Sequence, residues 1–89
     1  WDRQAFDRVA AAMHSFVRQR EAEEPIPRWI GEGFWYLDTF VRDWSHHENF
    51  PREHEPEYYE RACERLRDLA YWLFVGHSPY EGNSGFEPL

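Results

Sequence analysis

The stretch PEYYERACERLRDLAYWLFVG, residues 56–76, decides the fold. Apolar and small side chains recur in it at spacings of three and four residues, which places them on one side of an α-helix. They are Tyr59, Ala62, Cys63, Leu66, Leu69, Ala70 and Leu73. Pro56 suits the first turn of a helix and Gly76 suits the position just after the last one. The stretch therefore predicts an amphipathic helix that begins near Pro56 and ends before Gly76.

The chain before this helix predicts two more. From Asp2 to about Glu21 the apolar stripe consists of Phe6, Val9, Met13, Phe16 and Val17. Pro25 and Pro27 end that pattern, because proline cannot donate a backbone hydrogen bond and biases the preceding residue away from helix. From about Arg28 to Ser45 a second stripe consists of Ile30, Phe34, Leu37, Val41 and Trp44.

Three helices with one apolar stripe each predict an all-α fold, a small three-helix bundle around one core. The 89 residues suffice for one such domain, which we expect over residues 1–77. Residues 78–89 are rich in Gly, Ser and Pro and predict an irregular C-terminal tail. We expect Phe86 and Leu89 to hold this tail against the bundle.

The charge balance limits the classes of partner. The chain carries 17 acidic and 10 basic residues, a formal net charge of −7, and every basic residue is arginine. Nucleic-acid and anionic-membrane binders gain affinity from excess positive charge, so this composition opposes direct nucleic-acid binding and favours a protein partner with a basic surface. No run is long and apolar enough for a membrane span. The single cysteine, Cys63, fits a reducing compartment, and we expect a cytoplasmic protein without a cofactor.

Some large aromatic residues lie off the predicted stripes. Trp35 is roughly 140° from the centre of the stripe of its helix, near Arg42. Tyr71 and Trp72 lie off the stripe or on its flank in the third helix. Exposed aromatic residues with arginine nearby are typical of binding hot spots. We expect Trp35, Arg42, Tyr71 and Trp72 to contact a partner protein. The alternatives are that the tail, a fourth helix outside the given sequence or a second copy of the chain covers them, the last of these making a homo-oligomer.

The segment SHHENFPREHE, residues 45–55, concentrates histidine and glutamate. Asp43 and His47 stand one helical turn apart, and a loop brings His54 within reach, so a metal site of Asp43, His47 and His54 is one alternative. The segment contains no paired ligand motif such as CxxC or HExxH. We favour a polar loop between helices.

The run RDWSHH, residues 42–47, supports an enzymatic alternative. Its Arg and His, separated by four residues, resemble the motif of HEPN-domain ribonucleases, helical proteins that cleave RNA without a metal. The resemblance covers about 35 residues and implies that His47 acts as general acid or base and that Arg42 stabilises phosphate charge, with Asp43 as the accompanying polar residue.

The remaining pattern favours a binding protein over an enzyme. Carboxylates cluster at residues 21–24 and 53–64, where they can face a basic surface. In composition the chain resembles small inhibitors encoded by phages, including anti-CRISPR proteins. The sequence thus predicts a small, acidic, aromatic-rich protein-interaction module of the inhibitor kind.

Overall fold

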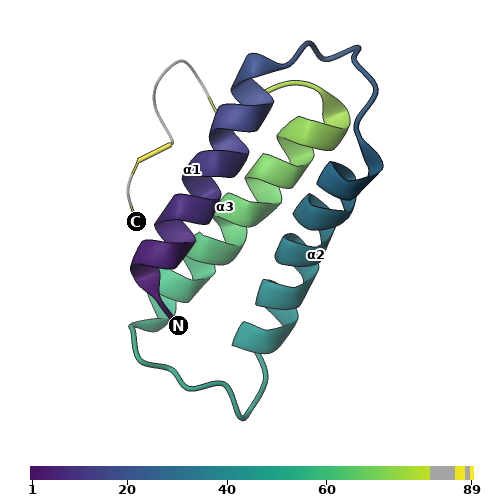
Figure 1. Ribbon diagram of the computed structural model, residues 1–89. Coiled ribbons are helices and arrows are strands. Elements are labelled where there is room, and N and C mark those ends of the chain that lie inside the picture. The colour runs from purple at the N-terminus through teal and green to yellow at the C-terminus, as the bar shows by residue number, and fades with distance from the viewer. Residues whose placement is uncertain (81–85, 88) are drawn as a thin grey trace.

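The chain folds as a three-helix bundle. The computed structural model describes residues 1–80, 86, 87 and 89, and the helices are α1 (Arg3–Gln19), α2 (Arg28–Ser45) and α3 (Pro56–Val75) (Figure 1). No strand occurs in those residues. The predicted all-α bundle is confirmed. The first helix is shorter than expected, since it ends at Gln19 and not near Glu21.

The helix ends follow from local chemistry. The Asp2 carboxylate accepts hydrogen bonds from the backbone N–H groups of Gln4 (2.9 Å) and Ala5 (3.2 Å), two donors that a helix start leaves unpaired. At the end of α3, Gly76 adopts a φ of 98°, which an L side chain rarely tolerates, and its N–H bonds to the Trp72 carbonyl. These caps set the bounds of α1 and α3.

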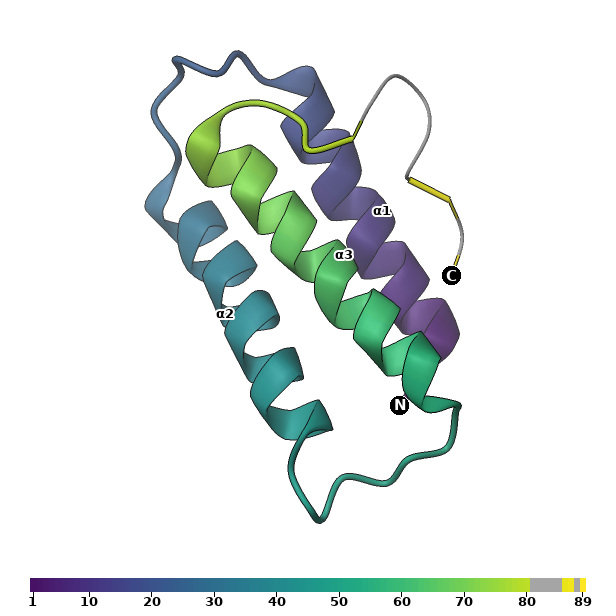
Figure 2. The same ribbon diagram turned by 180° about the vertical axis from the view of Figure 1, so that it is seen from behind.

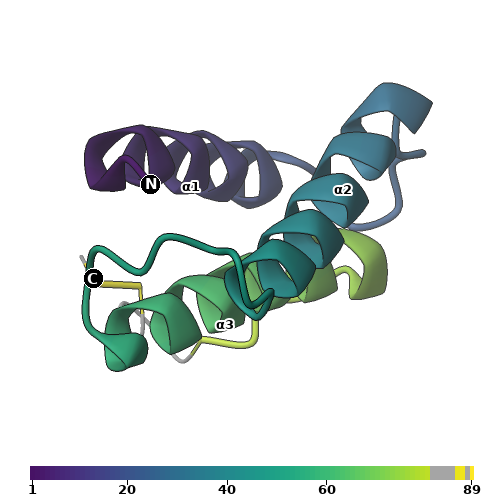
Figure 3. The same cartoon turned by 90° about the horizontal axis from the view of Figure 1, so that it is seen from below.

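The helices run up, down and up, and α3 lies between the other two (Figures 1 and 2). Both α1 and α2 pack mainly on α3, whereas they touch each other little. Seen from below, α1 lies above α3 and α2 lies to one side (Figure 3). The core side chains come from all three helices: Phe6, Ala10, Met13, Val17, Phe34, Ala62, Leu66, Leu69 and Leu73.

The buried face of α3 differs at three positions from the predicted stripe. Cys63, expected to be buried, is only half-buried, and its Sγ lies 3.5 Å from Ser45 Oγ. Tyr58 and Arg65 are buried instead. The reason is that α1 and the tail both cover this side of α3, which widens its buried face.

An aromatic cluster anchors the loop between α2 and α3. The Tyr59 hydroxyl accepts hydrogen bonds from the backbone N–H groups of Glu53 and His54, each 3.1 Å long. Phe50 is buried with its ring edge-on to Tyr59, at 5.1 Å between centroids. Trp1 closes the cluster by donating from Nε1 to the Tyr58 hydroxyl at 3.0 Å. Residues 45–55 therefore form an ordered connection between helices.

The C-terminal residues that the structure describes lie against α1 and α3. The Phe86 ring stacks on His14 at 3.7 Å between centroids, and the Arg3 guanidinium donates to the Leu89 carbonyl at 2.9 Å. Phe86 and Leu89 therefore lie against the bundle, as expected. Of the predicted irregular tail, residues 81–85 and 88 lie outside the described part. Within the described part, no helix combines the length and the apolar character that a bilayer crossing requires.

Candidate functional site

Three of the four predicted binding residues share the side formed by α2 and α3. Trp35 is 61% exposed, and Arg42 follows two turns later on the same face of α2. The Arg42 guanidinium donates to one oxygen of Asp38 at 3.0 Å, and Arg67 of α3 lies 3.4 Å from the other oxygen. Asp38 is therefore shared by both arginines and ties α3 to the Trp35 face of α2.

The α3 part of this side is aromatic. The Phe74 ring lies over Gly31, where an added Cβ would be 3.6 Å from it. Tyr71, one turn from Arg67, is 40% exposed, with its hydroxyl 3.3 Å from His77 Nε2. We call this set of side chains the Trp35 surface: Trp35, Asp38, Arg42, Arg67, Tyr71 and Phe74.

Trp72 lies on another side of α3. Its ring is 5.6 Å from that of His14 in α1 and 6.4 Å from that of Tyr80, both measured between centroids. Trp72 follows Arg67 by five residues, so its side chain points roughly 140° around α3 from that of Arg67. The structure thus places Trp72 beside α1 and the start of the tail and does not bring it to Trp35.

The residues of the ribonuclease-like alternative have separate partners. Arg42 is engaged by Asp38, whereas His47 lies beyond the end of α2, accepts the Asn49 N–H at 3.1 Å and packs its ring near Trp44. Asp43 is exposed. No contact described in the structure joins the Arg42 guanidinium to the His47 imidazole.

The metal alternative also fails to assemble. The His54 ring packs between Tyr58 and Tyr59, at 5.3 and 5.9 Å between centroids. Among residues 1–80, 86, 87 and 89, no group of three or more His, Cys, Asp or Glu side chains is placed to hold a metal ion. The structure therefore does not bring Asp43, His47 and His54 together as ligands.

A second exposed aromatic surface was not predicted. It follows α2 at spacings of four, three, four and four residues, and we call it the α2 aromatic stripe: Trp29, Gly33, Tyr36, Phe40 and Trp44. Its aromatic side chains are 74%, 54%, 48% and 38% exposed in that order. The expectation that Trp44 belongs to the buried stripe is corrected, because its ring lies over Phe50 of the following loop, at 5.7 Å between centroids, and its outer side stays exposed. The regular spacing was the signal that sequence reasoning missed.

An apolar cleft of about 220 Å³ lies between α1 and α2. It is lined by Trp1, Asp2, Ala5, Phe6, Val9, Leu37, Val41 and Leu66. Val9, expected on the buried stripe of α1, is 38% exposed here. The cleft exists because α1 and α2 pack on α3 more than on each other, so their facing side chains are only partly covered.

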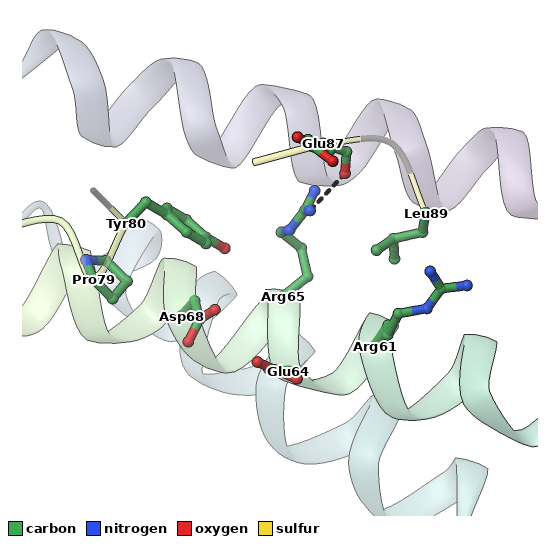
Figure 4. Close-up of a pocket in the computed structure, with 8 residues that line it drawn as sticks. All are labelled: Arg61, Glu64, Arg65, Asp68, Pro79, Tyr80, Glu87 and Leu89. Carbon is green, nitrogen blue, oxygen red and sulfur yellow. Dashed lines mark hydrogen bonds between the residues drawn. The ribbon is translucent and has the colours of Figure 1, made fainter. Parts of the chain in front are cut away.

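A polar pocket of about 480 Å³ lies under the tail (Figure 4). Arg65 reaches up from α3, donates to the Glu87 carbonyl at 2.6 Å, and places its guanidinium 4.0 Å from the centre of the Phe86 ring. Burial and then the Asp68 carboxylate raise the pKa of Tyr80 to about 12. Burial likewise raises the pKa of Asp68. Arg65 therefore contacts the tail twice, through a hydrogen bond to its backbone and a cation–π contact with one of its rings.

Comparison with protein families, curated proteins and solved structures finds no match to this chain.

Proposed function

We propose that this chain is a small acidic protein-interaction module that binds a protein partner through the Trp35 surface and acts by occupying the partner's surface, as an inhibitor does. The observation that carries the proposal is the 61% exposure of Trp35 beside two arginines. Trp, Tyr and Arg dominate the few residues that supply most of the binding free energy in protein interfaces.

The geometry also supports preorganised binding. Asp38 is only 14% exposed at its side chain and accepts a 3.0 Å hydrogen bond from Arg42, which holds that guanidinium in place before a partner arrives. The Arg67 side chain, 60% exposed, lies 3.4 Å from the other oxygen of Asp38. Thr39 Oγ1 donates to the Trp35 carbonyl at 2.7 Å, within the same turn of α2. Fixed side chains lose less conformational entropy on binding, which favours affinity.

The charge around the Trp35 surface favours a partner with a basic patch. Glu60 and Glu64 are exposed on the face of α3 that also carries Arg67 and Tyr71, and the whole chain has a net charge of −7. Opposite charges raise the association rate at low salt. We therefore expect capture of the partner to weaken as the salt concentration rises.

Affinity capture from a lysate of the source cells tests this proposal. Trp35→Ala is compared with wild type and with Trp29→Ala, a matched control that removes an even more exposed indole (74%) from another face of the same helix. The helical circular-dichroism signal confirms that each variant folds. We expect wild type and Trp29→Ala to capture a partner that Trp35→Ala loses. A partner retained by Trp35→Ala, or no partner of the wild type, would contradict the proposal.

A further inference from the structure

We propose that a second copy of this chain binds the α2 aromatic stripe, so that two α2 helices pack antiparallel about a twofold axis. The centre of the stripe lies roughly 140° around α2 from Trp35. The inference therefore goes beyond the function proposed above, because the Trp35 surface stays exposed in such a dimer.

The Trp35 surface and the α2 aromatic stripe differ in their charged residues, and this difference is typical of that between transient and self-association interfaces. The Trp35 surface contains three charged residues, whereas the α2 aromatic stripe contains none. Interfaces between identical subunits are more apolar than those of transient complexes. Large exposed apolar patches are also rare on monomers. The stripe has the composition of a surface that another copy covers.

Gly33, in the middle of the stripe, has no explanation within the described chain. Glycine weakens a helix interior, so its presence there calls for a reason. A Cβ built on Gly33 meets no atom within 4 Å, whereas one on Gly31 meets the Phe74 ring at 3.6 Å. Gly33 instead leaves a hollow in the outer surface of α2, between Trp29 and Tyr36, that is open to another molecule.

An antiparallel copy fills that hollow with its own side chain. When the two helices are centred between Tyr36 and Leu37, Gly33 lies level with Phe40 of the second copy, and Trp29 lies level with its Trp44. Twofold symmetry makes this contact twice, because Gly33 of each copy faces the Phe40 ring of the other. The same register brings Tyr36 to Tyr36 of the second copy at the axis.

The charges beside the stripe complement one another in this register. Arg28 and Asp43 lie on the same side of the stripe, with Asp43 exposed and nearer to it and Arg28 further round α2. The Arg28 side chain is 93% exposed and pairs with Glu32 of its own helix, at 3.1 Å between Nε and Oε1. In the antiparallel pair Arg28 and Asp43 of the second copy differ in height by about 3 Å, from a rise of about 1.5 Å per residue, which the long arginine side chain spans. Symmetry makes two such pairs, Arg28 with Asp43 of the second copy and the reverse.

Sedimentation equilibrium over a concentration series tests the dimer. Wild type is expected to shift with concentration from the 10.9 kDa chain mass to twice that mass. Phe40→Ala and Gly33→Ala are expected to weaken association about tenfold or more, the first by removing the ring and the second by filling the hollow. Trp35→Ala is the control and should associate like wild type. Gly33→Ala should at the same time make the monomer helix more stable, which excludes misfolding as the cause.

Charge exchange tests the register. Arg28→Glu and Asp43→Arg, each alone, should weaken self-association, while an equimolar mixture of the two variants should form a heterodimer whose pairs are restored. The proposal is overturned if wild type stays at the chain mass at every concentration. It is also overturned if Trp35→Ala weakens association as much as Phe40→Ala does. A monomer that still captures a protein through Trp35 would overturn the dimer and leave the proposed function standing. A dimer that captures no protein through Trp35 would support the dimer and overturn the proposed function.

Discussion

Tyr36 and Phe40 stack on the outside of α2, with ring centroids 5.3 Å apart and ring planes 7° from parallel. They are 54% and 48% exposed, and they stand one turn apart on a single helix. Their contact is therefore local and joins no two helices. The apolar area that remains exposed is the feature of this chain that most needs a partner to explain it.

This location predicts a small effect on the fold. Phe40→Ala should change the free energy of unfolding of the monomer by less than about 1 kcal/mol, since it removes a local pair on the surface of a helix. Urea denaturation at a concentration well below that of association measures it. A loss of about 2 kcal/mol or more would show that the ring serves the core.

For Leu66 we expect a large effect on the stability of the fold. Its side chain is 1% exposed and lies where α3 meets both other helices, so Leu66→Ala should cost about 2–5 kcal/mol of unfolding free energy. Val75→Ala is the control, because Val75 is 53% exposed at the end of α3 and should change that free energy by about 0.5 kcal/mol or less. Equal losses in the two variants would contradict the position of α3 at the centre of the bundle.

The tail contact gives a third prediction. Phe86→Ala removes the stack on His14 and the cation–π contact with Arg65, which together should lower the free energy of unfolding by about 1–2 kcal/mol. Glu87→Ala is the matched control, since the carbonyl that accepts from Arg65 belongs to the backbone and remains. Limited proteolysis should cut near the C-terminus faster in Phe86→Ala alone. Cutting of Phe86→Ala that is no faster than that of wild type would mean that Phe86 does not hold the tail.

The same contact should depend on pH through His14. Burial, then the charges of Arg18 and Arg65, lower the pKa of His14 below its usual 6.5. The unfolded chain therefore binds the proton more readily, and the free energy of unfolding should fall as the pH falls below about 6.5. Asp68 acts in the opposite sense, because its pKa is raised in the fold and protonation favours the folded state.

His14→Phe isolates this effect, since it keeps a ring for Phe86 to stack on and cannot titrate. The difference in unfolding free energy between wild type and His14→Phe should grow in favour of the variant as the pH falls from about 7 to 5. Urea denaturation at several pH values measures it, and the Asp68 contribution cancels in the difference. A difference that does not change with pH would show that His14 titrates alike in the folded and unfolded chains.

The sequence predicted the helices well because their signals are local. Pro27 before α2, Pro56 in the first turn of α3 and Gly76 after it act through backbone geometry that needs no tertiary contact. The observed bounds of α2, Arg28–Ser45, are the predicted ones. The Asp2 cap likewise starts α1 where the pattern begins.

The surfaces were harder to predict because periodicity gives the direction of a side chain and not what covers it. Viewed down its axis, α2 carries apolar side chains over a wide arc, with Phe34 at one edge and Tyr36 at the other. One neighbouring helix cannot bury the whole arc, so the positions of α1 and α3 decide which part stays exposed. Trp44 was therefore expected inside and is 38% exposed. Trp72 was expected to face a partner and instead packs near His14 and Tyr80.

Photo-crosslinking from position 35 in cells tests the central claim most directly. A photoreactive aromatic residue replaces Trp35, and the same residue at Arg8, an exposed position on α1, is the control. The account predicts a crosslink from position 35 to a protein other than this chain that position 8 does not form. No such crosslink, or the same set of crosslinks from both positions, would contradict the claim that the Trp35 surface binds a partner.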